Sequence, residues 1–119
     1  MRGLTSPRQI RVGKTMSLAD EFQQEALEGC KVLSREYHYR PTYFIQMVYE
    51  QGAVDAAKAL LKSKEPSEGL FTLWELGRLD MSVEAMALMG RYRSLFTPEE
   101  LATAKKRLDD LNYTLPEDW

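Results

Sequence analysis

The chain has 119 residues, of which 44% are hydrophobic, 10% aromatic and 29% charged, a composition that excludes wholesale disorder and a fibrous repeat. No apolar run approaches the ~20 residues that cross a bilayer, and the single cysteine excludes an intrachain disulfide. Since the N-terminus also lacks the apolar stretch of a signal peptide, we expect one domain and a cytoplasmic location.

The stretch MRGLTSPRQIRVGKT at the N-terminus differs in composition from the rest of the chain. It mixes Gly, Pro, Ser and cations without a helical period, so we predict a flexible basic arm at residues 1–15 and a helical domain at residues 16–119. The remainder is net acidic, which argues against a nucleic-acid-binding face across the whole domain. Met16 is also a plausible natural start, with the arm as an upstream extension. The cations of the arm are Arg2, Arg8, Arg11 and Lys14.

Apolar residues recur every three or four positions from Ser17 to Tyr37, which is typical of an amphipathic helix. The hydroxyl of Ser17 suits the N-cap, where it accepts from a free backbone N–H group. Gly29 costs roughly 1 kcal/mol relative to Ala inside a helix, so it suggests a close approach of a neighbour. Cys30 lies on the apolar side, and we therefore expect a buried thiol and not a nucleophile.

Two further helices follow before residue 63. Pro41 cannot continue the first helix but fits the first turn of a second one, and Gly52 offers its C-terminal stop. The next apolar pattern predicts a third helix from about Val54 to Lys62.

The fourth and fifth predicted helices meet at a corner. Ser67 suits the N-cap of a short fourth helix, which Gly77 ends in a left-handed conformation that costs glycine little. Residues 78–81 then make a tight turn, after which a fifth helix runs from Val83 to Met89. The fifth helix has almost no polar side, so we expect it to be the buried central element.

The sequence FTPEEL starts the sixth predicted helix. Thr97 is its N-cap, Pro98 takes the first helical position, and Glu100 completes a capping box with Thr97. The helix stops at Asn112. Since no stretch alternates as a β-strand does, the sequence predicts an all-α fold, a compact single-domain orthogonal bundle of about six short helices. The side chains expected to point outward from the sixth helix are Lys105, Lys106, Arg107, Asp109 and Asp110.

Four segments, YRPTYFIQMVYEQGAVDAAKALLKS, GLFTLWELG, GRLDMSVEAMAL and LFTPEELATAKKRLDDLNY, together resemble an uncharacterised bacterial helical module. This module occurs as short stand-alone proteins and as an appendage of larger ones. The resemblance extends from about Tyr39 to Tyr113 and leaves the arm and the first helix outside. It implies a shared helical fold and a cytoplasmic bacterial origin, but no established activity and no catalytic residue.

The stretch EYHYRPTYF is the first candidate site, because it interleaves aromatic and basic side chains that can stack bases or grip a peptide. The alternative is a helix junction in which the tyrosine rings pack inward and leave their hydroxyls in water. One histidine and a distant cysteine do not supply the three or four ligands that zinc usually takes, so we expect no metal. The candidate partner-binding residues are Tyr37, His38, Tyr39, Arg40 and Tyr43.

The corner holds the second candidate site. Arg78 and Asp80, with Glu75 and Glu84 nearby, form the most charged point of an otherwise apolar region. Arg78 could meet a ligand carboxylate or phosphate beside a helix N-terminus. The alternative, which the sequence favours, is an internal pair in which Arg78 closes the carbonyls of the preceding helix and Asp80 caps the next.

No set of titratable groups converges on one point of the sequence, so we expect neither an enzyme nor a cofactor. The leading hypothesis is a non-enzymatic bacterial protein that binds a protein partner through its first helix and the aromatic junction. The alternative hypothesis is nucleic-acid binding, in which the cations of the arm contact phosphates while Arg40 and the tyrosines stack on bases.

Overall fold

The computed structural model describes residues 16–116 and residue 119, and no β-strand occurs among them. The predicted all-α bundle of a single compact domain is confirmed, whereas the predicted arm at residues 1–15 lies outside the described residues. The six α-helices of the described part are α2 (Leu18–Tyr37), α3 (Thr42–Gln51), α4 (Ala53–Lys62), α5 (Glu68–Glu75), α6 (Val83–Ala87) and α7 (Pro98–Asp110). Two single turns of 3-10 helix, η1 (Leu79–Met81) and η2 (Arg93–Leu95), flank α6.

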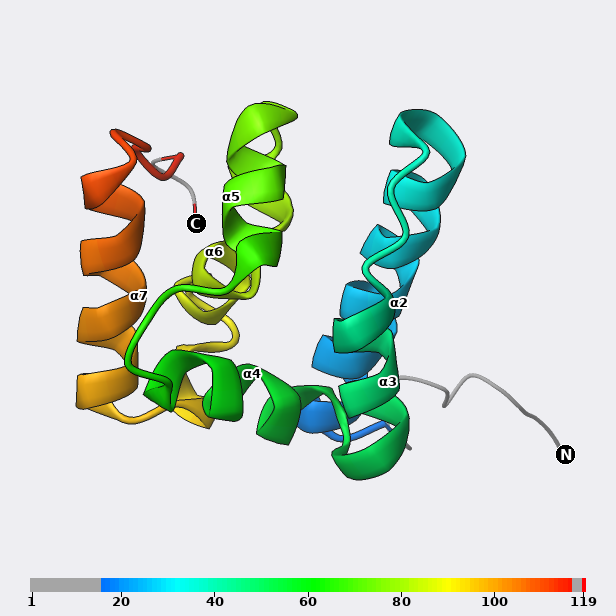
Figure 1. Ribbon diagram of the computed structural model, residues 1–119. Coiled ribbons are helices and arrows are strands. Elements are labelled where there is room, and N and C mark those ends of the chain that lie inside the picture. The colour runs from blue at the N-terminus through cyan, green and yellow to red at the C-terminus, as the bar shows by residue number, and fades with distance from the viewer. Residues whose placement is uncertain (1–15, 117–118) are drawn as a thin grey trace, which may run out of the picture.

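α4 lies at a steep angle to α2, α5 and α7, which stand upright in Figure 1. α4 runs across the lower ends of α2 and α7, which stand on opposite sides of it, and α3 folds back beside α2. α4 contacts α2, α3, α6 and α7, so it is the neighbour that these four helices share. None of the helices in this part of the chain combines the length and the apolar content that crossing a membrane requires.

Small side chains allow α4 to approach its neighbours closely. Ala53, Ala56 and Ala57 are almost completely buried. The N–H group of Ala53 donates to Oε1 of Gln23 at 3.0 Å, which fixes the start of α4 against α2. Gly52 joins α3 to α4 with φ 90°, a left-handed conformation that L residues with side chains rarely adopt. The third helix therefore begins at residue 53, one position before the predicted start.

An aromatic cluster joins α2 to the chain before α7. The ring of Phe22 meets Tyr92 edge to face at 5.1 Å and Phe96 at 5.6 Å. The hydroxyl of Tyr92 donates to Oε1 of Glu25 at 2.7 Å. Burial, together with this hydrogen bond, raises the pKa of Tyr92 to about 12, so the phenol stays protonated as a donor.

Capping boxes start the first and last helices, α2 and α7. The hydroxyl of Ser17 accepts from the N–H group of Asp20 at 3.1 Å, and the side chain of Asp20 accepts from the N–H group of Ser17 in return. Thr97 and Glu100 form the same reciprocal pair at the start of α7, as predicted. Such caps are typically worth about 1 kcal/mol each. Asn112 ends α7 in a left-handed conformation with φ 59°, also as predicted.

The chain turns sharply between α5 and α6. Gly77 has φ 73°, and the N–H group of Arg78 donates to the carbonyl of Leu73 at 2.8 Å, the arrangement of a Schellman C-cap. η1 follows, and the hydroxyl of Ser82 then accepts from the N–H group of Ala85 at 3.1 Å. The central, buried position predicted for α6 is confirmed. α6 ends at Ala87, two residues earlier than predicted, because the following N–H groups tighten into bonds with carbonyls three residues back.

Candidate functional site

The aromatic junction lies between α2 and α3, and the structure divides its five predicted residues. His38 ends α2 with φ 54°, and its side chain is exposed, as are those of Arg40 and Tyr43. Tyr37 and Tyr39 are half-buried and face the rest of the bundle. The structure therefore contains both arrangements that the sequence left open, with two tyrosine rings packed inward and three polar or aromatic side chains outward.

Tyr37 and Tyr39 connect α2 to the opposite side of the bundle. The hydroxyl of Tyr37 accepts from Nη1 of Arg78 at 2.9 Å. The hydroxyl of Tyr39 approaches Gly69 of α5 so closely that a Cβ atom at that glycine would lie 3.3 Å away. Burial raises the pKa of the Tyr39 hydroxyl, with a smaller opposing effect from Thr72. Both tyrosines thus have structural partners.

The side chain of Arg78 makes three hydrogen bonds at the corner. Its Nε and Nη2 atoms each donate to one carboxylate oxygen of Asp80 at 3.0 Å, and Nη1 donates to Tyr37. The guanidinium also lies over the ring of Tyr37, 5.5 Å from its centroid. The hydrogen bonds to Asp80 and Tyr37 raise the pKa of Arg78. The edge of the guanidinium formed by Nε and Nη2 is therefore occupied by Asp80.

The internal pair expected at the corner is present, but two details of the prediction were wrong. Asp80 does not cap the next helix, because Ser82 has that role while Asp80 binds Arg78. The side chain of Arg78 does not close α5, because the backbone N–H groups of Gly77 and Arg78 bind its last carbonyls. Glu84, expected near this corner, points away from it toward α7.

A buried charge pair joins α6 to α7, and the sequence prediction missed it. Nη1 of Arg107 lies 3.3 Å from Oε2 of Glu84, with side-chain exposures of 6% and 3%. Arg107 also donates to the carbonyls of Leu60 at 3.0 Å and Ser63 at 2.7 Å, so it closes the C-terminal end of α4. Burial raises the pKa of Glu84, although Arg107 opposes this rise.

Glu100 is a second buried carboxylate, and it lies at the start of α7. Its Oε1 atom accepts from Nζ of Lys58 at 2.9 Å and from the N–H group of Thr97 at 2.9 Å. Burial disfavours the charged form, but these two donors, with Lys62 near Oε2, outweigh it and lower the pKa of Glu100. This carboxylate connects α7 to α4.

The outward position predicted for Arg107 was therefore wrong. Residues 100, 104, 107, 108 and 111 recur at helical spacing on the side of α7 that faces the bundle. The charge of Arg107 favours an outward position, whereas its spacing along α7 favours the side that faces the bundle. Helical spacing was the signal that could have found it.

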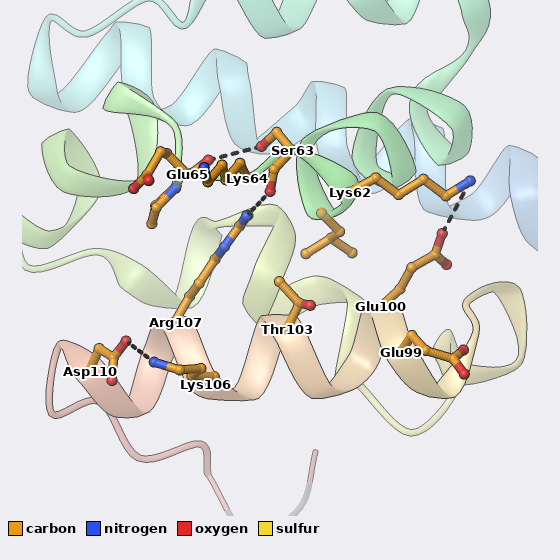
Figure 2. Close-up of a pocket in the computed structure, with 12 residues that line it drawn as sticks. Lys62, Ser63, Lys64, Glu65, Glu99, Glu100, Thr103, Lys106, Arg107 and Asp110 are labelled. Carbon is orange, nitrogen blue, oxygen red and sulfur yellow. Dashed lines mark hydrogen bonds and ion pairs between the residues drawn. The ribbon is translucent and has the colours of Figure 1, made fainter.

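A hollow of about 500 Å³ lies between the end of α4, the connection to α5 and one side of α7. Figure 2 shows Arg107 reaching from α7 to Ser63, and Lys62 facing Glu100 across the hollow. The hydroxyl of Ser63 bonds to the carbonyls of Leu60 and Glu65. The hollow therefore contains charges of both signs, most of them already paired, and no nucleophile beside a base.

Large apolar side chains remain exposed on two helices. Tyr43 and Tyr49 of α3 are 71% and 79% exposed, and Phe71 and Trp74 of α5 are 43% and 50% exposed. Of these four residues, only Tyr43 was predicted from the sequence to contact a partner. Scattered exposed apolar residues are ordinary on a protein surface, but two large ones on the same short helix make that helix a candidate contact surface.

Reactive groups do not gather in the described part of the chain. Within residues 16–116 and 119, no three His, Cys, Asp or Glu side chains are placed to hold a metal ion. The thiol of Cys30 is buried, as predicted, and burial raises its pKa to about 11, so it is a poor nucleophile at neutral pH. The cations of the predicted phosphate-binding arm, Arg2, Arg8, Arg11 and Lys14, lie outside the described residues.

Comparison of the chain with protein-family models, with curated proteins and with solved structures finds no match. The likeness to a bacterial helical module therefore stays a prediction made from the four segments of the sequence.

Proposed function

We propose that this chain is a non-enzymatic bacterial protein that acts in the cytoplasm by binding a protein partner through the outward side of α3 and the adjoining junction. One observation carries the proposal: Tyr43 and Tyr49 are the most exposed of the large apolar side chains, at 71% and 79%. Tyrosine combines a large apolar ring with a hydroxyl that water or a partner can bind, and it is enriched at protein interfaces.

The two tyrosines share their side of α3 with polar neighbours. Gln46 and Glu50 are exposed on the same side, and Nε2 of Gln46 donates to Glu50 at 3.2 Å. Arg40 is exposed just before the helix begins. Aromatic side chains surrounded by polar and basic groups make up the composition typical of the contact region in non-obligate complexes.

The proposal of a binding role and not a catalytic one rests on how the buried charges are used. Reaction sites usually bring titratable groups together beside a cavity, with some of their bonding capacity left for substrate. Here Arg78 and Arg107 are engaged by protein groups, Glu84 accepts from Arg107, and Oε1 of Glu100 accepts from Lys58, while Oε2 of Glu100 has only the more distant Lys62 beside it. These side chains support the fold.

Affinity capture from a bacterial lysate, with nuclease present, tests the proposal. We expect the full chain to retain a protein that the Tyr43→Ser, Tyr49→Ser double variant loses. A matched control is Lys105→Ser, which changes an exposed side chain on α7. A partner retained equally by the wild type and the tyrosine variant contradicts the proposed surface. Turnover of a defined substrate that one surface substitution abolishes contradicts the non-enzymatic role.

Nucleic-acid binding is the second candidate function, and the exposed pair Arg40 and Tyr43 supports it. An arginine beside an exposed ring can contact phosphate while the ring stacks on a base. This alternative predicts capture that nuclease abolishes and an affinity that falls steeply with salt. Replacing Arg8 and Arg11 by Gln in the full chain then lowers the affinity, whereas unchanged binding dismisses the role of the arm.

A further inference from the structure

α5 carries large apolar side chains on two of its sides, and the bundle covers only one of them. Leu70 and Leu73 are buried, while Phe71 and Trp74 point outward and are 43% and 50% exposed. Exposed apolar side chains that lie together often mark a contact with another molecule. The outward side of α5 therefore has apolar area that no described neighbour covers.

Phe71 and Trp74 form one contact surface. They are three residues apart, which places their side chains next to each other on a helix. Tryptophan is the residue type most enriched among those that dominate binding energy, and an adjacent phenylalanine enlarges the area that a partner can cover. We call these two residues and the glutamates that flank them, Glu68 and Glu75, the α5 surface.

The two charged residues of the α5 surface are both acidic. Glu68 and Glu75 are exposed, neither forms an ion pair with a described residue, and α5 contains no basic side chain. Glu75 lies in the last turn of the helix, where a carboxylate opposes the helix dipole and costs about 0.3–1 kcal/mol. A cation from outside α5 would therefore complement this glutamate.

We propose that the α5 surface binds a basic amphipathic segment of a protein partner. An apolar side chain of that segment packs on Phe71 and Trp74, while its Lys or Arg side chains lie beside Glu68 and Glu75. A cation can also bind over the indole face, which adds to the same preference. A second copy of this chain is disfavoured, because two α5 surfaces would bring glutamates of like charge together.

The α5 surface extends the proposed protein-binding function to a second helix, and the two can fail separately. The proposed binding role of Tyr43 and Tyr49 on α3 is tested by affinity capture with the tyrosine double variant. The α5 surface is tested with purified protein and defined peptides, in which α3 has no part.

The probes are a synthetic helical peptide of Leu and Lys and a matched peptide of Leu and Glu. In the full chain with Trp119→Phe, Trp74 is the only tryptophan, so its fluorescence reports on the α5 surface directly. We expect the Leu–Lys peptide to shift the emission to shorter wavelength and to bind roughly tenfold more tightly than the Leu–Glu peptide. Titration calorimetry on the unaltered chain checks that the Trp119 substitution has not changed binding.

Variants then assign the binding to the surface. We expect Phe71→Ser to weaken the Leu–Lys peptide roughly tenfold, and Glu68→Gln with Glu75→Gln to weaken it roughly fivefold and reduce its salt dependence. Lys105→Ser on α7 is the matched control and leaves the affinity unchanged. Absent binding, equal binding of both peptides or equal loss in the Lys105 variant overturns the inference. A dimer of the chain that Phe71→Ser dissociates overturns it in favour of a second copy.

Discussion

Two arginine–carboxylate pairs occupy opposite kinds of environment in this bundle. Arg78 and Asp80 lie two residues apart at the corner, join through two 3.0 Å hydrogen bonds, and expose 29% and 37% of their side chains. Arg107 and Glu84 come from different helices, meet at 3.3 Å, and are almost completely buried. The better hydrogen-bond geometry belongs to the exposed pair, yet we expect the larger effect on stability from the buried one.

Solvent explains this difference. Water screens a partly exposed pair such as Arg78 and Asp80 and can replace a lost partner, so such pairs contribute about 0–1 kcal/mol. A buried carboxylate that loses its partner has no water to replace it, and the cost rises to roughly 3–5 kcal/mol. Arg107 also binds two backbone carbonyls of α4 and the loop that follows, which the corner arginine does not.

The largest expected effect comes from Arg107→Met. This change keeps much of the side-chain volume but leaves Glu84 buried without its partner and leaves the carbonyls of Leu60 and Ser63 without their donor. We expect the free energy of unfolding to fall by about 3–5 kcal/mol, measured by urea denaturation. Adding Glu84→Gln to this variant should restore part of the loss. A single variant within about 0.5 kcal/mol of the wild type would show that the pair is not buried in solution.

A smaller effect is expected from Thr97→Ala, which removes the hydroxyl that caps α7 beside Glu100. The loss should be about 1 kcal/mol, seen as a lower denaturant midpoint with an unchanged slope. Thr103→Ala on the same helix is the control, since Thr103 has no part in the cap. Equal midpoints for wild type and Thr97→Ala would place the start of α7 elsewhere.

Asp80→Ala tests whether the partly exposed corner pair contributes less to stability than the buried pair. Because the corner pair is one-third exposed and Ser82 supplies the cap, we expect a loss below about 1 kcal/mol. Ser82→Ala should cost more, about 1 kcal/mol or above, since its hydroxyl is buried and bonds on both sides. If the order of the two variants is reversed in thermal or urea unfolding, Asp80 has a structural role beyond its pair with Arg78.

The smallest expected effect is on the loss of stability at low pH. The pKa of Glu100 is lower in the folded chain than its ordinary value of 4.5. Its contribution to stability is therefore present above pH 4.5 and is lost as the pH falls through the lowered folded pKa. Unfolding measured from pH 6 to pH 2 should show a shallower acid loss in Glu100→Gln than in the wild type. Parallel pH curves for the two proteins would contradict the assignment.

Local signals in the sequence were enough to predict most of the fold. Ser17, Ser67 and Thr97 each start the helix that they were expected to start, and Gly77 ends α5 in the left-handed conformation. These features depend on residues within one helical turn, where sequence spacing and spatial contact coincide. Helix ends shifted by one or two residues, because the last turn tightens or lengthens with its surroundings.

Contacts between residues far apart in the chain could not be predicted from the sequence. Tyr37 and Arg78 are 41 residues apart, and nothing local to either one indicates the other. Arg107 was expected outside and Glu84 near the corner of Arg78 and Asp80, because a buried charge pair cannot be recognised before the helices are placed. The exposure of Tyr49, Phe71 and Trp74 is also a property of packing, since each lies in a pattern that reads equally well as core.

The position of α4 has a consequence for how the chain opens. Four helices cover α4, so when any one of them separates locally, the other three still protect it. α5 packs chiefly against the short turn η1, so we expect it to open at a lower free energy than α4, although Leu70 and Leu73 hold it to the core. Amide hydrogens in α4 should therefore exchange with deuterium only during global unfolding, while those of α5 exchange through cheaper local openings. The helix that presents Phe71 and Trp74 is then the part of the bundle freest to adjust to a partner without unfolding the remainder.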